Sequence, residues 1–365
     1  MKKIITSESV NCGHPDKTCD IIADSFLDAA LSQDKDCQMA VECAIKDNKL
    51  FIYGESTTTA SIEYENIARE VLKDIGYKED FEIVKTLSQQ SPNIASAVKK
   101  DELCANDQGI MFGYATNENK YFMPYSIIIA HKLVKVYDEF RRKNSENYFA
   151  DAKSQVSVEY EDNKAVSINT ILMSVSHKKG LSHETIVNDL KQNVIAPVLK
   201  EFSELDSSNI KYVLNPSGEF YIWGSFSDSG CVGRKIVVDT YGGVGKVGGG
   251  CFSSKNATKV DRSGAYYARY VAKSIVAAGL ADKCEVELSY SIGLTHPLSV
   301  EVNTFGTNKV AENQIKAIVE NNFDFSVSNI IKELDLLRPI YAKTACYGHF
   351  GREEFPWEKI KTLKV

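Results

Sequence analysis

The sequence has 365 residues, 43% hydrophobic and 25% charged, which is typical of a folded chain of two to three domains. Its net charge of −6 argues against general nucleic-acid binding, which usually needs a basic surface. No apolar run approaches the roughly 20 residues of a membrane span, and no apolar stretch typical of a signal peptide follows the first lysines. Nine cysteines without a C-x-x-C pair argue against a disulfide framework and a structural zinc site, so we expect a reduced, cytoplasmic protein.

The first predicted helix begins at His14-Pro15-Asp16-Lys17. Proline fits the first helical turn because its missing N–H is not needed there, and an acidic side chain favours the positive end of the helix dipole. Its spacing predicts an amphipathic helix with a buried face of Ile22, Phe26 and Ala29. The same spacing predicts a solvated face of Asp20, Asp24 and Asp28.

Three parts of the chain follow one plan. Residues 37–76 and 154–199 each alternate apolar and polar residues, reach an Asp-Asn-Lys turn, and continue into a second strand and an amphipathic run. Residues 284–322 follow the plan less closely, with two strands around a Gly/Pro loop before a helical stretch. We therefore predict an α+β fold of three units, each a mostly antiparallel sheet with helices on one face, in domains at 1–100, 106–231 and 233–365.

The C-terminal third is predicted to contain an apolar strand at 236–238, a glycine-rich segment, and helices at about 261–278 and 329–337. The G-x-G-x-x-G at 243–248 does not fit a dinucleotide fingerprint, because about ten loop residues separate it from the next helix. A Walker A loop is also excluded, since Lys246 is followed by Val247.

The glycine-rich segment therefore keeps two interpretations. In one, its backbone N–H groups and flanking cations bind a polyphosphate, while Asp261 holds Mg²⁺ against the phosphates. The flanking cations are Arg234, Lys235, Lys255 and Lys259. In the other, the segment is a flexible surface loop with solvated lysines.

Longer motifs resemble those of S-adenosylmethionine synthetases. They lie, in one order over essentially the whole chain, at 6–10, 13–17, 106–114, 151–156, 233–243, 248–250, 259–263 and 347–357. The resemblance implies three pseudo-symmetric domains and a transferase of S-adenosylmethionine biosynthesis in one-carbon metabolism. In its reaction, the methionine sulfur attacks C5′ of the ATP ribose, and the released triphosphate is hydrolysed to pyrophosphate and phosphate. A thioether has no proton to lose, so such a site needs alignment and charge stabilisation and no general base.

The resemblance also implies a role for each matching residue. The expected catalytic set is His14, Lys153, Arg234, Lys235 and Lys255. ATP binding is expected to involve these residues together with Asp151, Phe220, Asp228 and Cys251. Methionine is expected to contact Glu55, Gln90, Asp228 and Lys259. The expected metal ligands are Asp16 and Asp261 for magnesium and Glu42 for potassium.

The same resemblance implies two Mg²⁺ ions per site, K⁺, and ATP and L-methionine as substrates. It implies a homodimer or homotetramer with sites at the subunit interface, without nucleic-acid or membrane partners, and a gating loop at about 90–108. Taken singly, these residues have plainer interpretations. His14 would cap a helix, Lys153 would be a loop lysine, and Glu42 and Glu55 would be solvent-facing partners of lysines.

Several positions depart from the family's usual pattern, among them Cys12, Glu219, Trp223 and Cys251. Glu219 replaces a cation near a polyanionic ligand, which predicts weaker ATP binding. Trp223 adds bulk near Asp228, which predicts a reshaped methionine or ribose pocket. An exposed thiol of lowered pKa at Cys12 or Cys251 would make the site sensitive to oxidation. These departures leave open a divergent paralogue using another nucleotide or methionine analogue, or a silent regulatory subunit.

Overall fold

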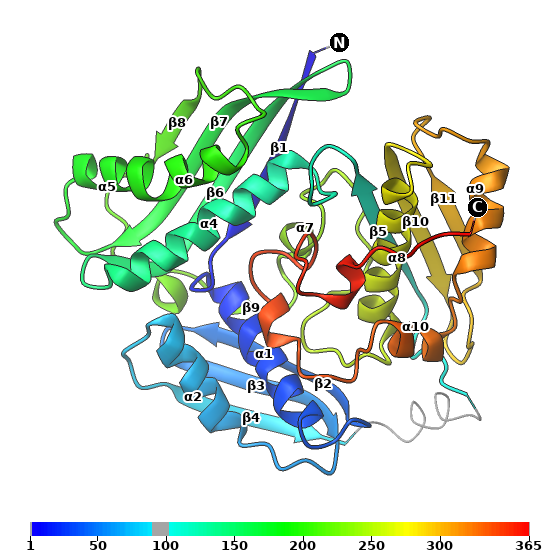
Figure 1. The fold of residues 1–365 in the computed structure, drawn as a ribbon. Coiled ribbons are helices and arrows are strands. Elements are labelled where there is room, and N and C mark those ends of the chain that lie inside the picture. The colour runs from blue at the N-terminus through cyan, green and yellow to red at the C-terminus, as the bar shows by residue number, and fades with distance from the viewer. Residues whose placement is uncertain (1, 90–101, 365) are drawn as a thin grey trace.

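The computed structural model describes residues 2–89 and 102–364, which form three lobes (Figure 1). Each lobe has one sheet, and most strand pairs are antiparallel; the pairs of β3 (Lys49–Thr57) with β4 (Glu82–Ser88) and of β7 (Lys164–His177) with β8 (Lys211–Leu214) are parallel. The predicted α+β class is therefore confirmed. No helix of the described residues is long and apolar enough to cross a membrane.

The first lobe contains a four-stranded sheet in the order β4-β3-β2-β9. Its elements are α1 (Pro15–Leu31), β2 (Gln38–Lys46), β3 (Lys49–Thr57), α2 (Tyr64–Ile75), β4 (Glu82–Ser88) and β9 (Gly230–Cys231). The predicted hairpin and helix at 37–76 are confirmed as β2, β3 and α2. Asp47 closes the hairpin with a left-handed φ of 50°, which Asp tolerates better than most residues.

The second lobe contains a sheet in the order β1-β6-β7-β8. Its elements are β1 (Lys2–Val10), α4 (Tyr125–Lys143), β6 (Tyr148–Glu161), β7 (Lys164–His177), α5 (His183–Asp189), the π-helical η1 (Leu190–Ile195), α6 (Ala196–Glu201) and β8 (Lys211–Leu214). Asp162 and Asn163 both adopt left-handed φ between β6 and β7, as the Asp-Asn-Lys turn predicted.

The third lobe contains a sheet in the order β11-β10-β5. Its elements are β5 (Gly109–Thr116), α8 (Val260–Ala277), β10 (Lys283–Tyr290), β11 (Ser299–Asn303), α9 (Glu312–Asn322) and α10 (Val327–Glu333). The third predicted hairpin and its helix are thus confirmed. The predicted helix at 329–337 is shorter and begins earlier, as α10. Four short helices complete the described part of the chain: η2 (Gly224–Phe226), α7 (Ile236–Asp239), η3 (Ala342–Thr344) and η4 (Pro356–Glu358).

The sheets exchange strands across the order of the chain. The first strand, β1, pairs with β6 in the second lobe, β5 pairs with β10 in the third, and β9 returns to β2 in the first. The predicted domain boundaries stay a prediction, because they follow the sequence and not these sheets. This exchange brings the start of α1, the start of β6 and the segment after β9 together at the centre of the molecule.

Two predictions about local structure are wrong. The predicted strand at 236–238 is the short helix α7, in which the N–H of Asp239 donates to the carbonyl of Lys235 at 2.9 Å. Tertiary contacts here override the strand preference of β-branched residues, because α7 directs Asp239 onto the buried Lys17. The predicted solvated face of α1 is also wrong. Asp20 and Asp24 are fully buried, and the predicted core residue Ala29 is only half-buried.

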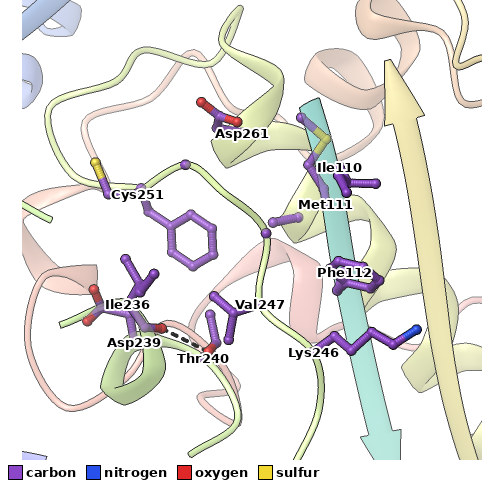
Figure 2. Close-up of a pocket in the computed structure, with 14 residues that line it drawn as sticks. Ile110, Met111, Phe112, Ile236, Asp239, Thr240, Lys246, Val247, Cys251 and Asp261 are labelled. Atoms are coloured by element: carbon purple, nitrogen blue, oxygen red, sulfur yellow. Dashed lines mark hydrogen bonds between the residues drawn. The ribbon is translucent and has the colours of Figure 1, made fainter. Parts of the chain in front are cut away.

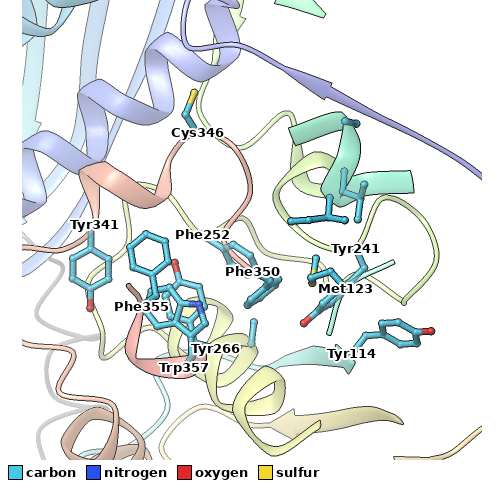
Figure 3. Close-up of a cluster of buried hydrophobic side chains, with 14 of the residues drawn as sticks. Tyr114, Met123, Tyr241, Phe252, Tyr266, Tyr341, Cys346, Phe350, Phe355 and Trp357 are labelled. Carbon is cyan, nitrogen blue, oxygen red and sulfur yellow. The ribbon is translucent and has the colours of Figure 1, made fainter. Parts of the chain in front are cut away.

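An aromatic cluster anchors the glycine-rich segment and the C-terminal tail to α8 (Figure 3). Tyr266 of α8 stacks on Trp357 with ring centroids 3.7 Å apart, and Tyr241 stacks on Phe350 at 4.9 Å. Phe252, also from the glycine-rich segment, is buried against Tyr266. The interpretation of this segment as a flexible surface loop is therefore wrong, because Tyr241 and Phe252 attach it to the core.

Candidate active site

The turn from β1 into α1 fixes His14 at the start of the helix. Backbone N–H groups in this turn donate to the carbonyls of Ala152 and Ala150 on β6, at 2.9 and 3.3 Å. His14 is the N-cap of α1, and its Nδ1 accepts from the N–H of Asp16 at 3.2 Å. The start of α1 and the start of β6 are therefore held as one unit.

The protonation of His14 follows from its surroundings. The side chain is almost fully buried, and burial, together with the positive charges of Lys235 and Lys153, lowers the pKa of His14 to about 3. The imidazole is therefore neutral near pH 7. Since Nδ1 accepts a hydrogen bond, the proton lies on Nε2, which can donate to an oxygen of a bound ligand.

Asp16 forms ion pairs with the two cations that follow β9. Its Oδ2 lies 2.6 Å from Nζ of Lys235, and its Oδ1 lies 3.5 Å from the guanidinium of Arg234. Oδ1 also accepts from the N–H of Cys231 at 3.0 Å. Arg234 keeps half of its side chain exposed, so it can turn toward a ligand.

Three more predicted residues lie beside His14. Lys153 and Asp151 lie two residues apart on β6 and therefore on the same face of the strand, with Lys153 exposed and Asp151 buried. Asp151 Oδ2 accepts from the N–H of Gly224 at 3.0 Å, and its buried Oδ1 has no partner among the described residues. Burial raises the pKa of Asp151 to about 6, while Lys153 opposes this shift and the exposed Asp228 adds to it. The negative charge of Asp228 also acts on His14, where it opposes the lowering of the pKa.

We call these residues the helix-start cluster: His14, Asp16, Asp151, Lys153, Asp228, Arg234 and Lys235.

A second set of predicted residues gathers where the glycine-rich segment meets α8. Lys255 Nζ lies 2.6 Å from Oδ2 of Asp261, in the first turn of α8. Burial lowers the pKa of Lys259, and the charge of Lys255 lowers it further, while Glu55 and Asp261 oppose the shift. A side chain at Gly250 would collide with the Asp261 carboxylate, so glycine allows this close approach.

We call Glu55, Lys255, Lys259 and Asp261 the glycine-loop cluster. Figure 2 shows Asp261 at a small pocket between β5 and the glycine-rich segment, with Cys251 on the side away from β5. Lys246 extends away from Asp261 in this view, toward its partners Glu285 and Glu287 on β10.

The two clusters are separate within one chain. No hydrogen bond or ion pair joins them in the part of the chain that the structure describes. Cys251 lies between them: Gly233, next to Arg234, packs so closely on Cys251 that a Cβ would collide with it. Lys255 acts electrostatically on the Cys251 thiol.

The carboxylates present fit magnesium better than a metal held by protein alone. Over residues 2–89 and 102–364, no group of three or more His, Cys, Asp or Glu side chains could hold a metal ion. Mg²⁺ usually takes one or two carboxylates and completes its shell with phosphate oxygens and water. Asp16 and Asp261 each offer one such carboxylate beside a lysine. Glu42, half-buried on β2 opposite Tyr53, offers an oxygen ligand for a hard cation.

The adenine-stacking candidate Phe220 is half-buried and fixed through its backbone. Its N–H donates to Nε2 of His177 at 3.1 Å, and its carbonyl accepts from the N–H of His177 at 2.9 Å. Nearby, Trp223 stacks on Tyr77 and Phe149, with centroids 4.6 and 6.0 Å away. Trp223 thus packs between the first and second lobes, and its effect on a substrate pocket stays a prediction.

The conditions for a reactive thiol near the site are not met. Burial raises the pKa of Cys12 to about 12, with the nearby Asp138 adding to the shift. Burial also raises the pKa of Cys251 to about 11, against the opposing charge of Lys255. Oxidation sensitivity was expected only for an exposed thiol of lowered pKa, so that expectation applies to neither cysteine. Gln90 and most of the predicted gating loop lie outside the described residues.

Sequence reasoning missed several residues that act on the site. Asp107, just before β5, contributes to the electrostatic environment of Lys259, and it lies in a motif that the sequence had marked. Lys17, Asp20 and Asp239 form a buried ionic group behind Arg234 and Lys235. One sequence signal could have indicated this ionic group: Lys17 lies within a predicted helix whose aspartates recur every four residues.

The fold defines a three-lobed α+β protein, and each cluster places a carboxylate beside a lysine, the two kinds of group that suit a metal-bound polyphosphate. Family models for the N-terminal, central and C-terminal domains of S-adenosylmethionine synthetase match residues 2–101, 102–220 and 222–359. The chain is 48% identical to the S-adenosylmethionine synthase of Mesoplasma florum, over the full length of both. It is 47% identical to that of Mycoplasma mycoides and 46% to that of Clostridium tetani, covering 96% and 98% of those proteins.

The chain therefore belongs to the S-adenosylmethionine synthetase family, whose members are methionine adenosyltransferases. The resemblance drawn from the motifs is confirmed, and so is the transferase class that it implied. Nothing in these comparisons favours a divergent paralogue.

Proposed function

We propose that this chain makes S-adenosylmethionine from ATP and L-methionine, by sulfur attack on ribose C5′ and hydrolysis of the released triphosphate. One observation carries the proposal. Each carboxylate expected to hold magnesium lies 2.6 Å from a lysine expected to bind phosphate: Asp16 with Lys235 and Asp261 with Lys255. Each pair can separate when the carboxylate binds a metal ion and the lysine binds a phosphate. The negative carboxylate then faces a cation and the positive lysine faces an anion, so both charges stay paired.

The residues of the helix-start cluster then act on the leaving triphosphate. Lys153, Arg234 and Lys235 balance the charge that grows on it, in a partly buried site where such interactions are strong. Neutral His14 donates from Nε2 to a phosphate oxygen. No residue needs to remove a proton from the sulfur. Asp16 and Asp261 would hold magnesium, expected as two ions per site, which would supply further charge neutralisation of the phosphates.

Other residues align the two substrates. Phe220 stacks on adenine, Asp151 and Cys251 contact ATP, and Asp228 contacts both substrates. Glu55, Lys259 and Gln90 hold methionine, and Lys255 adds a phosphate contact from the glycine-loop cluster. K⁺ binds at Glu42. The partly exposed apolar side chains Phe51 and Val84 on the first sheet support association with a second copy.

A product assay tests the function directly. Purified protein is incubated with ATP, L-methionine, Mg²⁺ and K⁺, and the products are measured by mass spectrometry. We expect S-adenosylmethionine, pyrophosphate and phosphate. A folded sample that makes none of these, but reacts with another nucleotide or a methionine analogue, would establish the divergent paralogue instead.

Two lysine variants test the site assignment. Lys235→Gln removes the cation paired with Asp16 and should lower kcat by about 10²–10³-fold, the usual effect of losing one preorganised donor. Lys246→Gln is the matched control, because Lys246 lies in the same glycine-rich region but pairs with Glu285 and Glu287 on β10. Equal losses in both variants would contradict the assignment.

A further inference from the structure

Four aspartates recur every four residues along one face of α1. They are Asp16, Asp20, Asp24 and Asp28, and all but Asp28 are fully buried. Each accepts a hydrogen bond from the backbone of a distant segment, at 2.9–3.0 Å. The face that the sequence pattern assigned to solvent is thus a row of acceptors.

The partners of this row differ in what they carry. Asp20 Oδ1 accepts from the N–H of Gly233 at 2.9 Å, and the next two residues are Arg234 and Lys235. Asp28 accepts from the N–H groups of Tyr341 and Ala342, both at 2.9 Å, in a segment that contributes nothing to either cluster. A carboxylate that accepts from backbone N–H groups therefore holds the segment of Arg234 and Lys235 at Asp20. At Asp28 the same kind of contact holds a connecting segment with no residue of either cluster.

The contact at Asp20 is part of a larger ionic group. Lys17 Nζ lies 2.8 Å from Asp20 Oδ2 and also pairs with Asp239. Asp239 ends α7, and its N–H donates to the carbonyl of Lys235. The backbone of Arg234 and Lys235 is thus attached to α1 on both sides, through Gly233 before and Asp239 after. We call Lys17, Asp20 and Asp239 the α1 clamp.

The clamp has the rigidity that positioning needs. All three side chains are almost completely buried, in the helix whose first turn supplies His14 and Asp16. Gly233 has a left-handed φ of 76° and packs on Cys251, so the segment cannot easily take another path. Long side chains such as Arg234 and Lys235 keep a defined position only when their backbone is fixed.

We propose that Asp20 is a positioning residue for the reaction: through the α1 clamp, it holds Arg234 and Lys235 where they meet the leaving triphosphate. This inference rests on the proposed function. It assigns to Asp20 no contact with substrate, and it places the effect of Asp20 on the chemical step and not on methionine binding.

The charges of the clamp make Asp20 suitable for substitution. One buried cation, Lys17, faces two carboxylates, so replacing Asp20 by a neutral residue leaves the Lys17–Asp239 pair intact. Asp24 is less suitable, because it forms a bidentate pair with the fully buried Arg262, which its removal would leave unpaired.

The experiment compares Asp20→Ala with the matched control Asp28→Ala, by steady-state kinetics and thermal unfolding. Asp20→Ala should lower kcat by about 10–100-fold, as expected when catalytic groups are misplaced by about 1 Å, with the KM for methionine changed less than about twofold. Asp28→Ala breaks two backbone contacts and should lower the melting temperature at least as much, with kcat nearly unchanged.

Asp20→Asn gives a rescue test. Its amide oxygen can still accept from Gly233, so its kcat should lie between those of wild type and Asp20→Ala. If Asp20→Ala does not fold, Asp20→Asn takes its place, and the matched control is then Asp28→Asn. Equal losses of kcat in the Asp20 and Asp28 variants, or an unchanged kcat in the Asp20 variants, would overturn the inference.

A second readout separates this inference from the proposed function. If wild-type protein makes no S-adenosylmethionine, the proposed function fails, and the clamp is tested by calorimetric binding of Mg²⁺–triphosphate. Weaker binding by Asp20→Ala than by Asp28→Ala would then support the clamp, and equal binding would contradict it.

Discussion

Burial of Asp151 makes the free energy of unfolding depend on pH. Its carboxyl is 3% exposed, one oxygen has no described partner, and burial raises its pKa from 3.8 to about 6. In the unfolded chain the group titrates near its ordinary value. Between about pH 4 and 6 the unfolded state therefore loses this proton while the folded state keeps it, and stability falls as pH rises.

The variant Asp151→Asn tests this sign. Asparagine does not titrate, and its oxygen can still accept from Gly224. Relative to wild type, the variant should gain up to about 3 kcal/mol between pH 4 and 6 and keep that gain at higher pH. Urea unfolding at pH 4, 5, 6 and 7 measures the difference. A difference that stays constant across this range would mean that Asp151 keeps an ordinary pKa in the folded protein.

At the level of helices and strands, the sequence predicts local structure better than packing. The hairpins of β2–β3 and β6–β7 follow from alternation and from Asp and Asn at the turns, which are local signals. The acidic face of α1 could not be assigned correctly. Its partners, including Gly233 and Tyr341, lie more than 200 residues away, so nothing near α1 in sequence marks these aspartates as buried.

The candidate site divides in the same way. Family motifs predicted the residues of both clusters, because their side-chain types are set by phosphate and metal chemistry. They did not predict the positions of Lys17 and Asp239, whose roles depend on the short helix α7. Residues expected to contact ligand can thus be named from motifs, whereas the residues that support them require the fold.

The contact between β5 and α8 gives a prediction at this scale. Gly113 of β5 lies directly against the backbone of Ala268 in α8, and an added Cβ would collide with it. Gly113→Ala should destabilise the protein by about 1–3 kcal/mol, the usual effect of overpacking. Gly249→Ala is the control, since a Cβ there meets nothing within 4 Å. Equal melting temperatures in the two variants would contradict this packing.

For the whole molecule, the separation of the two clusters bears on assembly. Within one chain, the Asp16–Lys235 pair and the Asp261–Lys255 pair are not linked by ion pairs or hydrogen bonds among the described residues. A site at a subunit interface would take the helix-start cluster from one copy and the glycine-loop cluster from the other. A two-fold axis would then generate two identical sites per dimer.

Mixing two inactive variants tests this arrangement. Lys235→Gln impairs the helix-start cluster, and Lys255→Gln impairs the glycine-loop cluster. If each site combines both chains, a mixed dimer has one site with both substitutions and one site with neither. Random re-association of equal amounts should therefore restore about a quarter of wild-type activity. Because every site inside a single chain would carry one substitution, recovery would be absent if both clusters served one chain. Refolding the two variants together and separately, followed by the same product assay, distinguishes the two arrangements.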